Sequence, residues 1–195
     1  MKNINTKKLT GVAIVLAIEI ILQVFGNFLV SLSGVNINLS LIPIAISAIV
    51  YGPFAGGLLG LVNGVIVLFS PSTQAIFFQY APLGTVLTCL LKCTIAGLMS
   101  GLVYKLLKNK NEFVATVIAA LLVPVLNTGL FALGAFTVML EAIKANNSGN
   151  ENVLKFVFLT MIGLNFIIEL AITTVLTPTV EKIRKIMTRS NKHAL

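Results

Sequence analysis

The sequence contains no aspartate and no tryptophan, and its one histidine, His193, lies two residues from the end of the chain. Metal-dependent chemistry inside a membrane and Ser–His catalysis therefore lack their usual ligands and bases. The two cysteines, Cys89 and Cys93, are one helical turn apart and too few for a disulfide framework, so we interpret them as core packing. No enzyme activity and no cofactor are expected.

Charged residues are also scarce: they make up 10% of the 195 residues, whereas hydrophobic residues make up 57%. A soluble domain has too little polar surface to cover such a core, which indicates an integral membrane protein. The net charge of +8 would suggest a nucleic-acid partner in a soluble protein. Here the basic residues gather at the chain ends and in one loop, as the anionic inner face of a lipid bilayer favours.

Six apolar segments of the chain are predicted to be transmembrane helices, since about 20 apolar residues cross the hydrocarbon core. Together they predict one all-α domain over residues 1–195, with an outward-facing binding cavity. We interpret residues 70–81, SPSTQAIFFQYA, as a loop that lies over a site or anchors at the interface, and Thr177-Pro178 as the end of the last segment. The predicted spans are residues 9–31, 39–51, 54–69, 82–107, 113–140 and 153–180.

The distribution of lysine and arginine predicts that both termini are cytoplasmic, because inner loops carry the excess of these residues. With this orientation the outer loops hold only Lys144 and Lys155. The inner side holds Lys2, Lys7, Lys8, Lys105, Lys108, Lys110, Lys182, Arg184, Lys185, Arg189 and Lys192.

One charge, Lys92, lies inside the fourth span, about 14 Å below its outer end at 1.5 Å per residue. That depth makes contact with water difficult, so the ammonium is expected to face the protein interior or a wet cavity. It belongs to a row of small and polar residues that repeats every four positions: Gly84, Thr88, Lys92, Ala96 and Ser100. A buried glutamate, Glu19 or Glu169, is the alternative partner of this lysine.

Amide side chains on several spans lie at similar predicted depths, and with a cation they suit a polar solute that carries an anionic group. Six packed helices with a few structural polar contacts are the alternative. The residues predicted to contact the solute are Lys92, Asn63, Asn127, Asn165, Glu169, Gln79, Tyr80 and Asn38.

The first span has two distinct faces. Ala13 and Ala17 form a small-residue pair that allows a partner helix to approach, although ordinary packing would give the same spacing. Glu19, Gln23 and Asn27 follow at four-residue spacing, on a face about 120° away at 100° per residue. We therefore expect the alanines on an outer flank and the polar stripe in the bundle interior.

The alanine pair, the passage LIPIAISAIVYGPFAGGLLGLVNG and the passage PLGT…KCTIAGLMSGLVYKLL resemble the substrate-binding S component of energy-coupling factor (ECF) vitamin transporters. The resemblance covers nearly the whole chain. It implies a prokaryotic plasma-membrane protein that binds a vitamin from outside at high affinity. It also implies that Ala13 and Ala17 dock on a transmembrane coupling subunit driven by two ATP-binding subunits. The absence of any Walker sequence agrees with a subunit that hydrolyses nothing itself.

The identity of the solute is less constrained by the sequence. Lys92 favours a carboxylate or phosphate, and the chain resembles pantothenate-type S components in size and in the 51–57 turn. Folate, riboflavin and other vitamins remain open, although the lack of tryptophan disfavours a large stacked ring. The competing classes are a membrane scaffold without transport, and a stand-alone channel or exporter.

Overall fold

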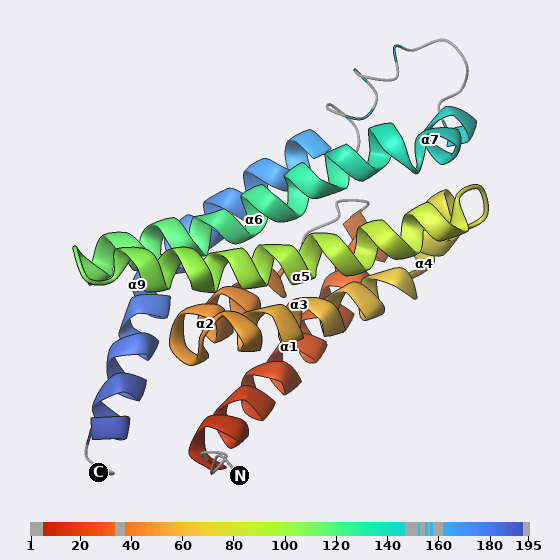
Figure 1. The fold of residues 1–195 in the computed structure, drawn as a ribbon. Helices are drawn as coiled ribbons and strands as arrows, with labels where there is room; N and C mark the ends of the chain where they lie inside the picture. The colour runs from red at the N-terminus through yellow and green to blue at the C-terminus, as the bar shows by residue number, and fades with distance from the viewer. Residues whose placement is uncertain are drawn as a thin grey trace.

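The structure is a computed structural model that describes residues 6–33, 38–146, 152, 155, 157 and 162–192. Within these residues it is helical and contains no strand (Figure 1). The helices are α1 (Thr6–Ser33), α2 (Leu41–Tyr51), α3 (Pro53–Leu68), α4 (Pro71–Thr73), the π-helical turn η1 (Gln74–Phe78), α5 (Pro82–Leu107), α6 (Glu112–Thr137), α7 (Leu140–Asn146) and α9 (Leu164–Lys192).

Three helices of the described chain are long and apolar enough to cross a membrane: Thr6–Phe28, Pro82–Leu107 and Glu112–Thr137. A fourth span results if Pro53–Leu68 and Pro71–Phe78, which meet at a bend of 61°, are counted together. Leu41–Tyr51 is a shorter apolar helix. The all-helical membrane class is confirmed, whereas the six-span topology stays a prediction.

Helix α3 packs against α5 with almost no side chain between them, and the two run side by side in Figure 1. A Cβ atom built at Gly60 would overlap the carbonyl of Cys93, and one at Gly64 would lie 2.5 Å from the carbonyl oxygen of Cys89. Gly56 meets the carbonyl oxygen of Gly97 in the same way, at 2.7 Å. The glycines of α3 that face α5 therefore form a backbone contact that fixes the register of α3 on α5.

Adding one methyl group at this contact should measurably destabilise the protein. In the Gly60→Ala variant the new Cβ meets a backbone carbonyl, which cannot rotate away, so α3 and α5 must separate at a cost of about 1–3 kcal/mol. Gly129→Ala is the matched control, because a Cβ there meets nothing within 4 Å. Equal melting temperatures of the two purified variants would contradict this packing.

A different face of α5 packs against α6. A Cβ at Gly134 would overlap Thr88, and the hydroxyl of Ser100 donates to the carbonyl oxygen of Ala119 at 2.7 Å. These contacts confirm the buried row that contains Lys92 and place it toward α6. Gly97 and Gly101 follow this row along the sequence but face α3. Gly97 meets the backbone of Gly56, and Gly101 meets Pro53 at the start of α3.

The prediction of a loop at residues 70–81 was wrong for most of its length, because α4 and η1 fill residues 71–78. Ser70 caps α4 by accepting a hydrogen bond from the Thr73 amide, and Pro71 occupies the first turn, where no amide donor is needed. The polar residues that indicated a loop are thus a helix start.

The helix itself does not end at Thr177-Pro178, because α9 continues to Lys192. The end of the last membrane span at this point stays a prediction. Proline removes one backbone donor but is accommodated where a helix bends. The Thr177 hydroxyl donates to the carbonyl oxygen of Thr173, and that of Thr174 donates to Leu170, each at 2.7 Å. In Figure 1 the C-terminal part of α9 leaves the side of α6.

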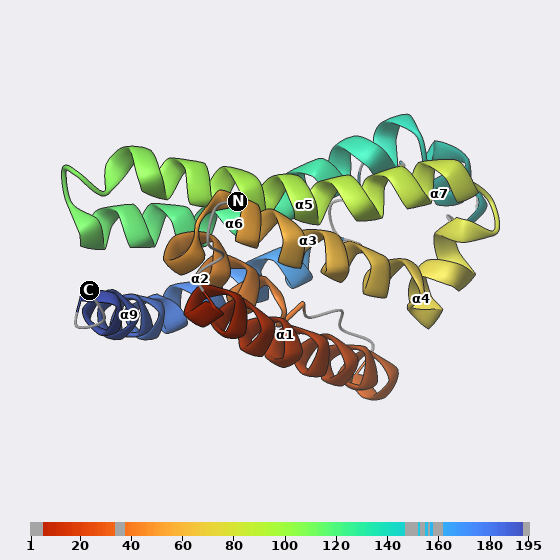
Figure 2. The same ribbon diagram turned by 60° about the horizontal axis from the view of Figure 1, so that its bottom comes forward.

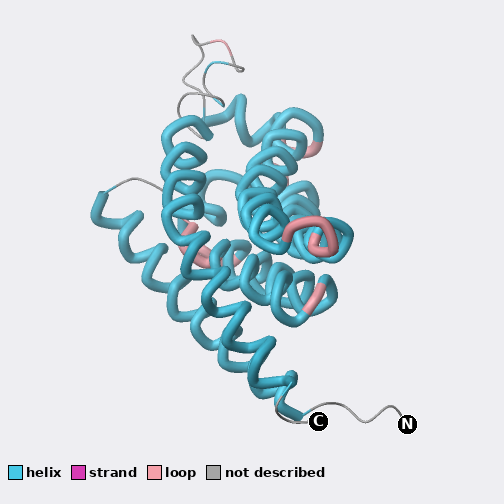
Figure 3. The backbone as a smooth tube through the Cα atoms, turned by 90° about the vertical axis from the view of Figure 1, so that its left-hand side faces the viewer, coloured by secondary structure: helices cyan, strands magenta, loops and turns pink. Residues whose placement is uncertain are grey.

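Helix α1 lies on the side of α2 and α3 that faces away from α5 and α6 (Figure 2). Gly11 allows the ring of Tyr51 to pack directly on the α1 backbone. The beginning of α1 and the end of α9 lie at the same end of the molecule (Figure 3). The prediction that both termini lie on one side of the membrane requires this arrangement.

Candidate functional site

Lys92 is buried between α5 and α6, with 9% of its surface exposed. Its Nζ atom lies 5.1 Å from the centroid of the Phe131 ring, which gives a cation–π contact. In the described part of the chain no carboxylate lies within 4.0 Å of this ammonium, although Glu169 interacts with it electrostatically. Among the described residues, Lys92 is therefore a buried cation without a direct ion pair.

Glu169 brings α9 to this region. Its side chain is buried, and Oε1 accepts a hydrogen bond of 3.2 Å from the backbone amide of Asn38, in the segment that leads into α2. The carboxylate thus connects α9 with the connection between α1 and α2, at a position where it also acts on Lys92.

A second group of polar side chains joins α1, α3 and the segment before α2. The hydroxyl of Ser40 donates to Gln23 Oε1 at 2.8 Å, and the amide nitrogen of Asn63 donates to Gln23 Oε1 at 3.4 Å and to Ser40 Oγ. Gln23 in turn donates to Asn27, one turn further along α1, at 3.3 Å. Three chain segments are held together by amide and hydroxyl groups that a polar solute can also use.

Cys93 connects this group to α6. Its sulfur lies 3.5 Å from Asn63 Oδ1 and 3.3 Å from Asn127 Oδ1, within the range of a weak thiol hydrogen bond. Both cysteines are free and buried, so the interpretation as core residues is confirmed. The amides of Asn63 on α3 and Asn127 on α6 therefore meet at the Cys93 thiol of α5.

Aromatic side chains border Lys92 on the side of η1 and α7. Phe77 of η1 stands edge-on to Phe131, with ring centroids 5.8 Å apart and an interplanar angle of 85°. Both rings pack against an apolar cluster that includes Ala135, Met139 and Ile143. Phe131 was missed by the sequence analysis, but it follows Asn127 by one helical turn, which places it on the same face of α6.

The predicted site residues separate into three groups. Lys92, Asn63, Asn127, Glu169 and Asn38 belong to the connected interior region described above. Asn165 is half-buried one turn before Glu169 on α9. The structure does not bring Gln79 and Tyr80 into this region, since both are exposed between η1 and α5. The residues that join the region without having been predicted as site residues are Gln23, Ser40, Cys93, Phe77 and Phe131.

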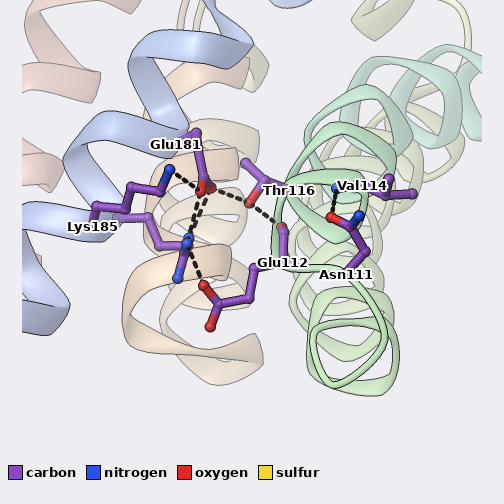
Figure 4. A network of polar contacts seen from close by, with 7 residues as sticks. Asn111, Glu112, Val114, Thr116, Glu181 and Lys185 are labelled. Atoms are coloured by element: carbon purple, nitrogen blue, oxygen red, sulfur yellow. Dashed lines mark hydrogen bonds and ion pairs between the residues drawn. The ribbon is translucent and has the colours of Figure 1, made fainter.

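A separate ion cluster joins α6 and α9 where the apolar part of α9 ends (Figure 4). Arg184 binds both oxygens of Glu181 at 2.7 and 2.8 Å and reaches Glu112 at 2.7 Å, while Thr116 donates to Glu181 at 2.7 Å. The hydrogen bonds from Arg184 lower the pKa of Glu181 to about 2, and Thr116 acts in the same direction against the effect of burial. The ionised form of Glu181 thus stabilises the folded state.

This cluster predicts a specific loss of stability in acid. The contribution of ionised Glu181 to the stability of the folded state is complete above the ordinary glutamate pKa of 4.5. It is lost as the pH falls toward the lowered pKa of about 2. Glu181→Gln should lower stability at neutral pH by about 1–3 kcal/mol and remove most of the decline in that acid window. The measurement is the melting temperature of the purified protein, with exposed Glu141→Gln as the control. An unchanged acid decline in Glu181→Gln would contradict the role of the cluster.

In a comparison with known protein families, the model of the ECF transporter substrate-specific component matches residues 7–181. No curated protein and no solved structure matches the chain. Proteins of this family are binding subunits of transporters and not enzymes. The match extends over most of the chain and includes nearly all of α1, the interior polar region and α9 as far as Glu181. This chain therefore belongs to the substrate-specific component (S component) family of ECF transporters.

Proposed function

We propose that this S component binds a small anionic vitamin, with pantothenate as the first candidate, and that Lys92 holds the anionic group. The observation that carries the proposal is a buried ammonium without a direct carboxylate partner in the described chain, among amide groups. An isolated buried charge is costly, so an anion that reaches it gains a strong contact.

The neighbouring residues have complementary roles in this proposal. Asn63, Asn127 and Asn165 offer amide donors and acceptors to the polar groups of the solute. Glu169 accepts from a solute hydroxyl or amide and stays tied to the Asn38 backbone. Phe77 and Phe131 supply an apolar wall. Gln79 and Tyr80 contact the solute only if their exposed segment closes over it.

The transport cycle that we propose needs partner subunits. The chain crosses a prokaryotic plasma membrane six times, keeps both termini in the cytoplasm and opens its binding cavity to the outside. It docks through Ala13 and Ala17 on a transmembrane coupling subunit that two ATP-binding subunits drive. In support, both alanines are exposed on α1, while Glu19 and Gln23 on its other face are buried.

Mass spectrometry of small molecules released from gently purified protein tests the solute assignment, because high-affinity binders often retain their ligand. Equilibrium binding of labelled pantothenate then gives the affinity. Release of folate or another anionic vitamin would replace pantothenate but keep the role of Lys92. A retained ligand without an anionic group would contradict that role. Failure of the purified protein to bind any vitamin would favour a scaffold without transport.

A further inference from the structure

Glu19 of α1 has an unusual environment for a glutamate. Its side chain is 0% exposed, and neither carboxylate oxygen has a hydrogen-bond partner among the described residues. The hydroxyl of Ser47 on α2 is buried in the same condition. Contacts of Gly11 with Tyr51 and of Gln23 with Ser40 set α1 antiparallel to α2, so both unpartnered groups lie between those two contacts.

No positive charge compensates Glu19 from the helices packed around it. Helices α2 and α3 contain no aspartate, glutamate, histidine, lysine or arginine, and the one titratable group of α2, Tyr51, packs on Gly11 two turns away. The titratable group that interacts with Glu19 from α5 is the Cys93 thiol, which Lys92 and Glu169 also influence. Lys92 itself lies over Phe131 and acts on Glu169.

The polar neighbour of Glu19 cannot neutralise it either. The side chain of Asn63 lies close enough to offer Glu19 a hydrogen bond, but in the observed geometry its amide nitrogen donates to Gln23 and Ser40. Gln23 Oε1, which could join Glu19 around a metal cation, already accepts hydrogen bonds from Ser40 and Asn63, and the unpartnered Ser47 hydroxyl is a single neutral ligand. An ionised carboxylate without donors or a cation is strongly disfavoured in an apolar interior, whereas the protonated acid supplies its own donor.

We propose that Glu19 is a proton-binding site inside the membrane, and that its bound proton stabilises the packing of α1 against α2 and α3. This proposal goes beyond solute binding and does not depend on the identity of the solute. Ionisation of Glu19 leaves an uncompensated negative charge in the interface of α1 with α2 and α3. Rising pH therefore weakens the packing of α1.

The first test compares melting of the full-length purified wild type with that of Glu19→Gln and the exposed control Glu141→Gln. The unfolded wild type releases the Glu19 proton above the ordinary glutamate pKa of about 4.3, while the folded protein keeps it. The unfolding equilibrium constant of the wild type should therefore rise with pH by up to tenfold per pH unit relative to that of Glu19→Gln, until the folded protein also releases the proton. Glu141→Gln should follow the wild type. Parallel pH curves for wild type and Glu19→Gln would overturn the proposal.

Infrared spectroscopy supplies a test that does not require a folded variant. The chain has no aspartate, so a protonated-carboxyl band at neutral pH arises from one of its six glutamates or the C-terminus. Glu169 is a second buried glutamate and can contribute to this band, so its contribution is removed by Glu169→Gln. The wild type should show the band with a deuterium shift, the band should persist in Glu169→Gln, and it should vanish when Glu19→Gln or Glu19→Leu is added to Glu169→Gln. Absence of the band in the wild type would overturn the proposal. So would a sodium-dependent rise in the wild-type melting temperature that Glu19→Gln abolishes, because a cation would then occupy the site.

Discussion

Replacing Lys92 by methionine should weaken binding of the anionic solute roughly 10- to 100-fold and leave the fold intact. A charge-assisted contact contributes about 1.5–3 kcal/mol, and each 1.4 kcal/mol is a factor of ten in affinity. Methionine retains the length of the stem and a favourable contact with the Phe131 ring. Because Lys92 makes no direct ion pair in the described chain, the substitution leaves no carboxylate stripped of a bonded partner.

Two controls separate a binding role of Lys92 from a structural one. Lys105→Met removes an exposed lysine of the same helix and should not change solute affinity. A neutral analogue of the solute that lacks the anionic group should bind the wild type weakly and lose little more in Lys92→Met. If Lys92→Met binds the natural solute normally but melts at a much lower temperature, the lysine serves the fold through Glu169 and the site assignment fails.

The helices could be predicted from the sequence where local signals are strong. The fourth span was predicted as residues 82–107, which are the bounds of α5, because Pro82 opens it and a charged turn follows it. Local signals misled at residues 70–81 and at Pro178. Serine and proline mark helix starts as often as loops, and a proline ends a helix only if its bend cannot be accommodated.

The site could be predicted only as far as single-helix faces allow. Lys92, Asn63 and Asn127 were identified because a polar residue in an apolar helix is conspicuous by itself. Phe131 and Cys93 could not be identified from the sequence, because their roles depend on which helices pack together and in what register. The glycines of α3 set that register on α5, and it brings the Cys93 thiol between Asn63 and Asn127.

Placing tryptophan at both Ala13 and Ala17 should abolish solute uptake while solute binding to the purified S component stays intact. Small side chains let a partner helix approach to about 8 Å, and an indole ring prevents this by van der Waals overlap. Both alanines are exposed on α1, so the new rings point away from the interior polar region. In the proposed transport cycle, uptake needs the docked complex, whereas solute binding needs only the interior of the S component.

The matched control for this variant is a tryptophan pair at Ala171 and Val175, which have the same four-residue spacing and are exposed on α9. That pair adds the same bulk to the membrane-facing surface but lies on a different helix, so uptake should remain close to wild type. Uptake by cells and equilibrium binding to purified protein are the two measurements. If the Ala13 and Ala17 variant loses solute binding as well, the two alanines are needed for the internal packing of α1, which positions Glu19 and Gln23. The assignment of this face to docking then fails. If both tryptophan pairs abolish uptake, the loss follows from added surface bulk and does not locate the docking face on α1.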